Sequence, residues 1–534
     1  MDLSGEATVD NQGKGPNGTP AGYARLIQRH GLRVIPNWHE SHVAPTTVRR
    51  KAAAPDGSVF EIYGAAYWPG DSDFEHLEFA LKYDGTNLAL LAELFQVLDA
   101  DGLTQFIAAA PFGKYRRRLW YLFEWLTRRR LSLADMASGN YVDLVPAEEC
   151  FTSARRRLVA RQRVNDNLLG DRSFSPTIRR TAALKAYAAA ALSERCTSLI
   201  ADCAPDVLHR ALSYLYTKET KSSFAIEREE PTPDRTTRFV DLLARAQRES
   251  WCEKPRLLAL QHAIVDQRFR ETDYRTRQNY VGESVSFGQE RVHYVCPKPE
   301  QVAALMAGLT VTDVRLRESQ IHPVVHAAAV GYGFVFIHPF EDGNGRIHRF
   351  LIHNILAMRG FTPPGIMVPV SAAMLRDQRA YDASLEAFSR PLLDLVEYRL
   401  DDEGQMTVMG DSSASYQYPD LTFQTEALFR FVEQTIERDL PEELDYLRGY
   451  DRTKRLMQGV VDLPDQKLDL FIRLCNQNGG KLSAAKREGQ FAMLTDNEIK
   501  RLEDAVRVGT EITHCRTGTG GMTPCQTRFM AAVR

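Results

Sequence analysis

Apolar residues recur at intervals of three and four positions along most of the chain, beginning near Asp71. This spacing is typical of amphipathic α-helices, which bury one face. The segment 274–296 differs, because Val and Tyr alternate there with polar residues, and Gly282 and Gly288 interrupt the run. Alternation predicts a short β-hairpin in that segment and a further strand at Ser58–Tyr63. We therefore expect a mainly α protein with few strands.

Shifts in composition predict how these elements are divided. The first residues are rich in Gly, Asn and Pro and lack the apolar run of a signal peptide, so we expect a disordered leader. A second polar, Gly- and Ser-rich stretch follows Leu400 and predicts a linker. The expected segments are a leader at 1–21, a helical N-terminal domain at 22–205, a core at 206–400, a linker at 401–420 and a helical C-terminal domain at 421–534.

The C-terminal domain carries a helix-start signal. Thr495 and Glu498 have the spacing of a capping box and open an apolar helical run. We favour a simple packing domain for this region, and a winged-helix-like module is the alternative.

Charge and cysteine usage exclude several classes of protein. Lys and Arg number 67 and Asp and Glu number 69, which gives a formal net charge of −2 over 534 residues. Neither a polycation that coats nucleic acid nor an acidic disordered chain has this balance. No apolar run reaches the roughly 18 residues that a membrane span needs. The eight cysteines form no CxxC pair, which favours reduced thiols, no structural metal and a cytoplasmic location.

One segment is basic and aromatic. Residues 114–130 read KYRRRLWYLFEWLTRRR, and clustered arginines with aromatic rings can bind nucleic acid. Because the chain as a whole is not basic, we favour a packed helix with Trp120, Phe123 and Trp125 or Leu126 inward and solvated arginines outward.

The stretch Ile337–Arg349, IHPFEDGNGRIHR, concentrates residues with phosphate chemistry. An apolar helix is predicted to end before Pro339, and the Gly343-Asn344-Gly345 turn opens the next helix. A helix N-terminus offers free N–H groups and a positive dipole end to an anion. Arg346 and Arg349 share one face of its first turn, where the dipole disfavours cations. A polyphosphate held by both guanidiniums accounts for their placement.

Two further side chains of this stretch suit nucleotide chemistry. Asp342 offers hard oxygen ligands for a Mg²⁺ ion that also touches phosphate. His338 can take a proton at neutral pH. His348 and His353 lie outside this pattern, and we interpret them as structural or surface residues.

The pattern H-x-F-x-[DE]-G-N-G-R-x-x-R resembles the signature of the Fic family, and the chain matches every restricted position. The matching residues are His338, Phe340, Asp342, Gly343, Asn344, Gly345, Arg346 and Arg349. RTRQNYVG at Arg275–Gly282 and the helical run after it also look like the family's flap and following helix. The resemblance covers about Lys218 to Leu400. It implies a Fic-type helical core with a flap at about 274–296 and a catalytic loop at 338–349.

The resemblance further implies transfer of AMP from ATP to a Ser, Thr or Tyr hydroxyl of a target protein, with release of pyrophosphate. His338 would be the general base that deprotonates the hydroxyl. Asp342 would hold Mg²⁺ against the α- and β-phosphates. The Gly343 and Gly345 amides with Asn344 would form the anion hole, which meets the charge that develops during transfer.

The resemblance places the β- and γ-phosphates on Arg346 and Arg349, and it also implies an inhibitor of that site. The segment Ser223–Glu227 has the form [ST]-x-x-x-E, similar to the inhibitory helix of Fic proteins, expected at about 219–230. Glu227 would pair with Arg349 and so take the position of the γ-phosphate. The family usually has Gly or Asn after this glutamate, whereas this chain has Arg228, a cation that could compete for the charge of Glu227.

Other functions stay open on the sequence alone. The anion hole would recognise phosphates better than bases, so the chain could transfer another nucleotide or a phosphate-linked group. Glu227 could instead align water to remove AMP from a modified protein. The protein could also modify itself. Finally, segment 114–130 or the C-terminal module could make it a regulator that binds DNA or a partner.

Overall fold

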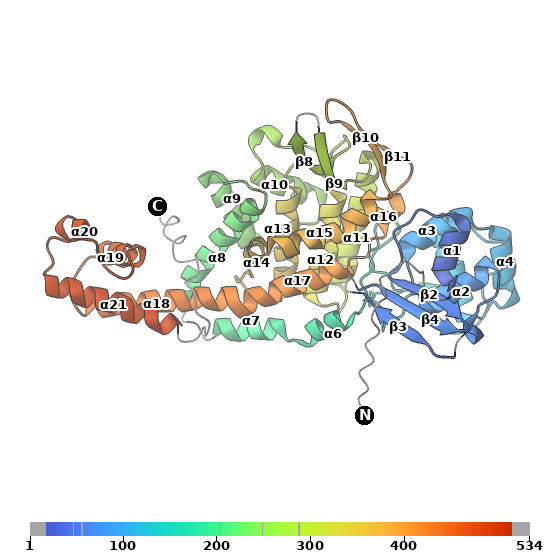
Figure 1. Ribbon diagram of the computed structural model, residues 1–534, viewed down its shortest axis with the longest axis horizontal. Helices are drawn as coiled ribbons and strands as arrows, with labels where there is room; N and C mark the ends of the chain where they lie inside the picture. Colours follow the sequence, from blue (N-terminus) through green and yellow to red (C-terminus); the bar gives the residue numbers. More distant parts are fainter. Residues whose placement is uncertain are drawn as a thin grey trace. The chain divides into compact units, whose positions relative to one another are not determined.

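The longest apolar helix forms the buried centre of the computed structural model. Helix α12 (Pro323–Ile337) is buried at every residue from Val324 to Ile337. Helix α13 (Asn344–Met358) packs against it (Figure 1). Gly331 permits this approach, because a Cβ at that position would come within 2.9 Å of the Ile352 side chain. The loop of residues 338–343 connects these two buried helices, so its ends are held rigidly.

The structure describes residues 18–514 apart from residues 46, 55, 56, 202, 204, 248, 287 and 288. Contacts divide the chain into two compact units. The first consists of Met1–Ala190, Ser223–Phe361 and Asp377–Arg430, and the second of Ala191–Ser222, Thr362–Arg376 and Phe431–Arg534. The domain boundaries expected from composition stay predictions.

The N-terminal part of the first unit mixes short strands and helices. Its elements are β1 (Thr19–Ala21), α1 (Gly22–His30), β2 (His39–Ala44), β3 (Arg50–Ala53), β4 (Val59–Gly64), η1 (Ala65–Tyr67), α2 (Asp73–Tyr83), α3 (Leu88–Val97), α4 (Ala100–Ala109), α5 (Lys114–Thr127), β5 (Val142–Asp143), β6 (Arg157–Val159), β7 (Val164–Asp166) and α6 (Ala182–Ala189). One sheet has the order β1-β2-β4-β3, with β2 and β4 parallel, and another the order β5-β7-β6. Of these strands, only β4 was expected from the sequence. All four residues of β3 are exposed, so its sequence carries no alternation.

The basic, aromatic segment forms helix α5. Trp120, Phe123 and Trp125 are buried in the core of this region, as the packed-helix interpretation requires. The arginines differ from expectation, because two of them are buried as well. Arg117 donates to the carbonyl of Asn140, and Arg118 donates to the hydroxyl of Thr86. Arg117 and Arg118 therefore form hydrogen bonds inside the protein and are not solvated at its surface.

The rest of the first unit surrounds α12 and α13. Its further elements are α9 (Pro233–Arg245), α10 (Lys254–Ile264), η2 (Gln267–Phe269), β8 (Tyr280–Ser286), β9 (Gln289–Val295), α11 (Pro299–Arg317), α15 (Gln378–Leu393), β10 (Glu397–Leu400), β11 (Met406–Met409) and α16 (Ser413–Gln417). Strands β8 and β9 pair antiparallel and form the expected hairpin (Figure 1). Gly288, expected to interrupt this run, lies outside the described residues.

Two segments expected to be irregular contain regular elements. The expected leader lies outside the described residues up to residue 17, but Thr19–Ala21 pairs with β2. The expected linker contains β11 and α16. Its polar sequence is ordered by long-range backbone bonds, since the N–H of Ser175 donates to Gln417 and that of Thr177 donates to Pro419.

The second unit is helical. Its elements are α7 (Leu192–Ala201), α14 (Val370–Arg376), η3 (Thr435–Asp439), α18 (Leu440–Gln458), α19 (Asp465–Gln477), α20 (Ala484–Glu488) and α21 (Asp496–His514). Thr495 and Glu498 form the expected capping box at the start of α21. Its described residues contain no strand, and a winged helix would need one. Helices α8 (Pro205–Ile226) and α17 (Thr422–Gln434) contribute residues to both units.

No helix among the described residues has both the length and the apolar character needed to cross a membrane. The six cysteines within the described part of the chain form no disulfide, and Cys515 and Cys525 lie outside that part. The protein is mainly α-helical, with a few short strands.

Candidate active site

The loop between α12 and α13 is closed by its own side chains. His338 caps α12 in a left-handed conformation with φ 51°, and Gly343 turns the chain into α13 with φ 91°. The Asn344 side chain accepts from the Phe340 N–H at 3.1 Å and donates to the Phe340 carbonyl at 2.7 Å. These two bonds fix the orientation of the Asn344 amide, so this residue can offer an anion its backbone N–H and the second hydrogen of Nδ2.

The first turn of α13 presents backbone donors. Ile347 donates the first helical hydrogen bond, to Gly343, so the N–H groups of Asn344, Gly345 and Arg346 have no acceptor within the helix. A Cβ on Gly345 would lie 2.1 Å from Oε1 of Glu227. The Glu227 carboxylate therefore rests directly on the backbone of this turn, where the dipole favours an anion.

His338 is held in one tautomer. Its Nδ1 lies 3.1 Å from the Val335 carbonyl, so Nδ1 carries the proton and Nε2 keeps its lone pair. Burial lowers the pKa of His338 to about 4, and the Val335 hydrogen bond offsets this only in part. The ring is therefore neutral near pH 7 and can accept a proton at Nε2.

Arg349 is held by residues at the end of α8 and by the hydroxyl of Tyr381 in α15. Its Nε donates to the Ser223 hydroxyl at 2.9 Å, and its Nη2 donates to the Ser223 carbonyl at 2.7 Å and to Glu227 Oε1 at 2.8 Å. Burial alone would raise the pKa of Glu227, but the guanidiniums of Arg349 and Arg346 act against burial and contribute to a pKa below the usual value. Glu227 is therefore an anion at neutral pH, paired with the second arginine of the loop pattern.

Arg346 is equally buried, and two carboxylates hold it. Its Nη1 donates to Glu229 at 2.9 Å, and its Nη2 donates to Asp342 Oδ1 at 2.6 Å. Its Nε is buried without a hydrogen-bond partner among the described residues. A buried donor left in this way is costly, so the site has unused capacity for an anion.

The chain reverses immediately after Glu227. The N–H of Arg228 donates to Ala225, and the N–H of Glu229 donates to Phe224, which is the hydrogen-bond pattern of a Schellman motif. Arg228 occupies the left-handed position of that motif with φ 58°. Gly and Asn adopt this conformation more readily than Arg, and the turn brings Glu229 back toward α13.

The structure brings the expected site residues together. His338, Asp342, Gly343, Asn344, Gly345, Arg346 and Arg349 all belong to the loop and the first turns of α13. Arg349 is contacted by Ser223 of α8 and by Glu227 directly after that helix. His348 is buried beside Tyr381, and burial lowers its pKa well below the usual value, as a structural role requires. His353 is also buried, in α13.

Three residues near this loop were not singled out by the sequence analysis. Arg275 is buried and donates to the carbonyls of His338, at 2.8 Å, and Pro297, at 2.6 Å. Its guanidinium therefore ties the loop to the base of the hairpin. Arg275 belongs to the segment Arg275–Gly282, which resembles the flap, but nothing in that segment indicated a role for this residue alone.

Glu271 and Glu229 are the other two. Glu271 follows α10 in the chain. It accepts from the N–H of Glu341 at 2.9 Å and so supports the loop. Burial, with added repulsion from Glu341 and Asp342, raises the pKa of Glu271 to about 7. Glu229 follows the [ST]-x-x-x-E segment Ser223–Glu227 by two residues, and that proximity was the signal that could have found it.

The residues present suit a magnesium ion. Mg²⁺ in nucleotide sites is usually held by one or two carboxylates, water and the substrate's phosphates. Asp342 is such a carboxylate, with a side chain 42% exposed, and it lies beside Arg346. The described residues contain no group of three or more His, Cys, Asp or Glu side chains that could hold a metal alone, so a metal here would need the nucleotide as a further ligand.

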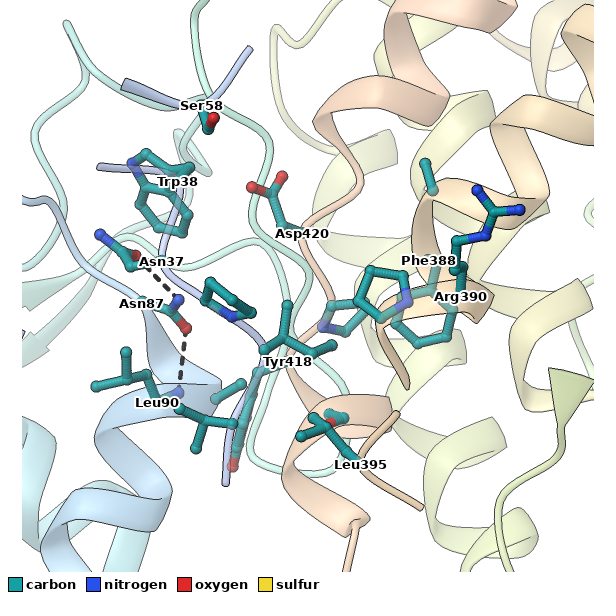
Figure 2. Close-up of a pocket in the computed structure, with 18 of the residues that line it drawn as sticks. Asn37, Trp38, Ser58, Asn87, Leu90, Phe388, Arg390, Leu395, Tyr418 and Asp420 are labelled. Atoms are coloured by element: carbon teal, nitrogen blue, oxygen red, sulfur yellow. Dashed lines mark hydrogen bonds between the residues drawn. The ribbon is translucent and has the colours of Figure 1, made fainter. Parts of the chain in front are cut away.

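A large pocket of the first unit is separate from this loop. It has a volume of about 1230 Å³, and none of residues 338–349 lines it. Figure 2 shows Trp38, Phe388, Tyr418 and Asp420 among its walls. Arg179 also lines this pocket and contacts two of these residues. Its guanidinium carbon lies 5.1 Å from the centre of the Trp38 ring, and its Nε lies 2.9 Å from the Asp420 carboxylate.

Residues 251–356 match the model of the Fic/DOC family. The matched range is similar to a Fic domain and includes the hairpin, α12, the loop and most of α13. The matched range begins after Glu227 and Glu229, so it does not include the end of α8.

Curated proteins are similar to this chain over only part of their length. The chain is 28% identical over 191 residues to protein adenylyltransferase Fic of Drosophila grimshawi, a match covering 34% of this chain and 35% of that protein. It is 31% identical over 138 residues to the protein of the same name from Drosophila virilis, covering 24% and 25%. The chain thus spans about a third or a quarter of these relatives.

Two solved structures are also similar. A Fic family protein from Desulfovibrio desulfuricans has a TM-score of 0.35 at 20% identity, with 61% of this chain and 84% of that chain covered. A Fic domain containing signaling protein from Bacteroides thetaiotaomicron has a TM-score of 0.35 at 20% identity, with 48% and 96% covered.

Proposed function

We propose that this protein is an adenylyltransferase that moves AMP from ATP to a hydroxyl side chain of a protein. The observation that carries the proposal is the arrangement at α13. A histidine with a free Nε2, unpaired helix N–H groups and two arginines converge on one turn. The Drosophila relatives are named protein adenylyltransferase Fic, in agreement with this chemistry.

The proposed reaction uses these groups in sequence. Nε2 of His338 takes the proton of the incoming hydroxyl, whose oxygen forms a bond to the α-phosphorus of ATP. The bond between the α-phosphorus and the bridging oxygen breaks, and pyrophosphate leaves with the electron pair. The backbone N–H groups of the α13 turn and the guanidiniums of Arg346 and Arg349 stabilise the added negative charge. Mg²⁺ held by Asp342 would supply further neutralisation of the phosphates.

We further propose that the end of α8 inhibits this reaction. Glu227 supports this role because it lies on the Gly345 backbone and pairs with Arg349, both of which a nucleotide's phosphates would need. Two anions cannot share one guanidinium and one small anion hole without strong repulsion. In the wild-type chain, we therefore expect weak ATP binding and slow transfer.

The test compares wild type, Glu227→Gly, His338→Ala and the double variant. Each is incubated with Mg²⁺ and ATP labelled at the α-phosphate, with and without cell lysate, and protein-bound label is counted. We expect label to rise in Glu227→Gly and to vanish in the double variant. Label on the protein itself would identify self-modification.

Two results would overturn the proposal. Label that persists without the His338 side chain would reject His338 as the general base. Absence of label in every variant would reject AMP transfer. In the second case, the same assay with other labelled nucleotides asks whether the site transfers a different group. Equal label in wild type and Glu227→Gly would leave transfer standing and reject the inhibitory role.

A further inference from the structure

A second carboxylate from the inhibitory segment occupies the other arginine. Oε2 of Glu229 accepts from Nη1 of Arg346 at 2.9 Å, and the Arg346 side chain is only 2% exposed. This contact repeats the Glu227–Arg349 pair at 2.8 Å, one helical turn away. Both cations expected to bind phosphate are therefore paired with acids from one three-residue stretch, Glu227–Glu229.

Glu229 is held in this position from two sides. Nη2 of Arg235 donates to the same Oε2 atom at 3.1 Å, and Arg235 is itself anchored by donating to the Ile264 carbonyl. Beneath the pair, the buried ring of Phe224 lies 5.1 Å from the Arg346 guanidinium and 5.0 Å from that of Arg235. The carboxylate is thus placed by a built network and not by a chance surface contact.

The pair also reaches the residue expected to bind the metal. Arg346 bridges Glu229 and Asp342, since its two terminal nitrogens donate to one carboxylate each. A phosphate oxygen that binds Nη1 of Arg346 competes with the Glu229 carboxylate for that nitrogen. The unpaired Nε of Arg346 shows that the present pairing does not satisfy all of its donors.

We infer that Glu229 is a second inhibitory carboxylate, which competes with nucleotide phosphates for Arg346 as Glu227 does for Arg349. The inference rests on the proposed function, because it takes the two arginines to be phosphate ligands. Full release then requires that both carboxylates leave. Removal of Glu227 alone frees one arginine and leaves the other neutralised.

The test measures nucleotide binding and transfer separately. The dissociation constant of α,β-methylene ATP with Mg²⁺ is measured by calorimetry for the full-length protein. The variants are Glu229→Gln, Glu227→Gly, the double variant, and Glu230→Gln as a matched control at the exposed neighbouring position. Glutamine keeps the size of Glu229 and removes its charge. Because the pair is partly open to solvent, we expect about three- to tenfold tighter binding for Glu229→Gln.

The supporting pattern is specific. Glu229→Gln tightens binding in both the wild-type and the Glu227→Gly backgrounds, the double variant binds more tightly than either single variant, and Glu230→Gln changes nothing. Unchanged binding on replacing Glu229 in both backgrounds would overturn the inference, as would absence of nucleotide binding in every variant. If Glu229 served only to hold Arg235, its replacement would lower the melting temperature without tightening binding, which also overturns it.

The same variants separate this inference from the proposed function. Tighter binding in Glu229→Gln with no protein labelling in any variant would keep the second carboxylate and reject AMP transfer. Labelling that depends on His338 and rises in Glu227→Gly, with no effect of Glu229 on binding, would keep the transferase and reject the second carboxylate.

Discussion

At the scale of single residues, the site is defined by which polar atoms the protein uses itself and which it leaves available. Asn344 uses Oδ1 and one hydrogen of Nδ2 to close the loop on Phe340. His338 uses Nδ1 on Val335 and keeps Nε2 for a proton. The loop therefore separates atoms that fix its shape from atoms that can do chemistry, and this division sets its pH dependence.

We expect AMP transfer by Glu227→Gly to fall on acidification only below about pH 5. A general base works in its deprotonated form, and burial lowers the pKa of His338 to about 4, so the ring stays neutral through the physiological range. The negative charge of Glu227 raises the pKa of His338, so removing Glu227 does not shift the acidic fall in rate to higher pH by this effect. Single-turnover rates from pH 4.5 to 8 check this, and half-loss near pH 6.5 would contradict it.

A second titrating group requires a control for that profile. Glu271 contacts the loop at the Glu341 N–H, and its pKa is raised to about 7 by burial. The same rates are therefore measured in Glu227→Gly/Glu271→Gln. A limb near pH 7 that disappears in this variant would belong to Glu271, whereas a limb that persists below pH 5 belongs to His338.

At the scale of secondary-structure elements, helix ends place the functional groups. The sequence predicted α12, α13 and the hairpin, because each has a strong local pattern. It also led us to expect Glu227 beside Arg349, through a resemblance to a known motif. It could not predict that Glu229 reaches Arg346, since this contact depends on Arg228 adopting a left-handed conformation after α8. The sequence did not predict strand β3 either, because all of its residues are exposed and it shows no alternation of apolar and polar positions.

The cap of α8 gives a test of this element. Arg228 has φ 58°, which costs a non-glycine residue roughly 1 kcal/mol. Arg228→Gly should relieve that strain, stabilise the inhibitory turn and lower basal transfer about fivefold, equivalent to about 1 kcal/mol. Labelling rates and hydrogen exchange at residues 223–229 check this. Arg228→Ala is the matched control, since it removes the exposed side chain but keeps the strain, and an equal effect of both variants would contradict the prediction.

The link between the hairpin and the loop gives a second test at this scale. Arg275 holds the carbonyls of His338 and Pro297 with one buried guanidinium. A lysine has one nitrogen and cannot reproduce these bonds. We expect Arg275→Lys in the Glu227→Gly background to lower the transfer rate by about tenfold or more, because His338 is displaced, while nucleotide affinity stays the same. The exposed neighbour Arg277→Lys should change neither, and a loss of affinity equal to the loss of rate would reject the positioning role.

At the scale of the whole chain, the first unit is assembled from segments far apart in the sequence. Residues 175–177 bind residues 417–421 through backbone hydrogen bonds, including one from the Leu421 N–H to Thr177. Such pairs leave no local pattern, and for this reason a Gly- and Ser-rich stretch was expected to be a linker. The stretch nevertheless contributes buried apolar side chains to the unit, among them Met406, Tyr416 and Tyr418.

These contacts predict that the segment 401–420 resists proteolysis from Met406 onward. The Tyr418 hydroxyl donates to the Arg172 carbonyl at 2.9 Å, and its ring lies 5.7 Å from that of Trp125. A broad-specificity protease should therefore cut the folded wild-type protein slowly between residues 406 and 420, because cleavage needs local opening that breaks these contacts. Tyr418→Ala should speed cleavage there markedly by removing the buried ring, whereas Tyr418→Phe, which loses only one hydrogen bond, should stay close to wild type. Mass spectrometry of the early fragments makes the distinction. Early cleavage of wild type within 406–420 would mean that the stretch behaves as the flexible linker that its composition suggests, and that the bonds to residues 175–177 contribute little to holding the unit together.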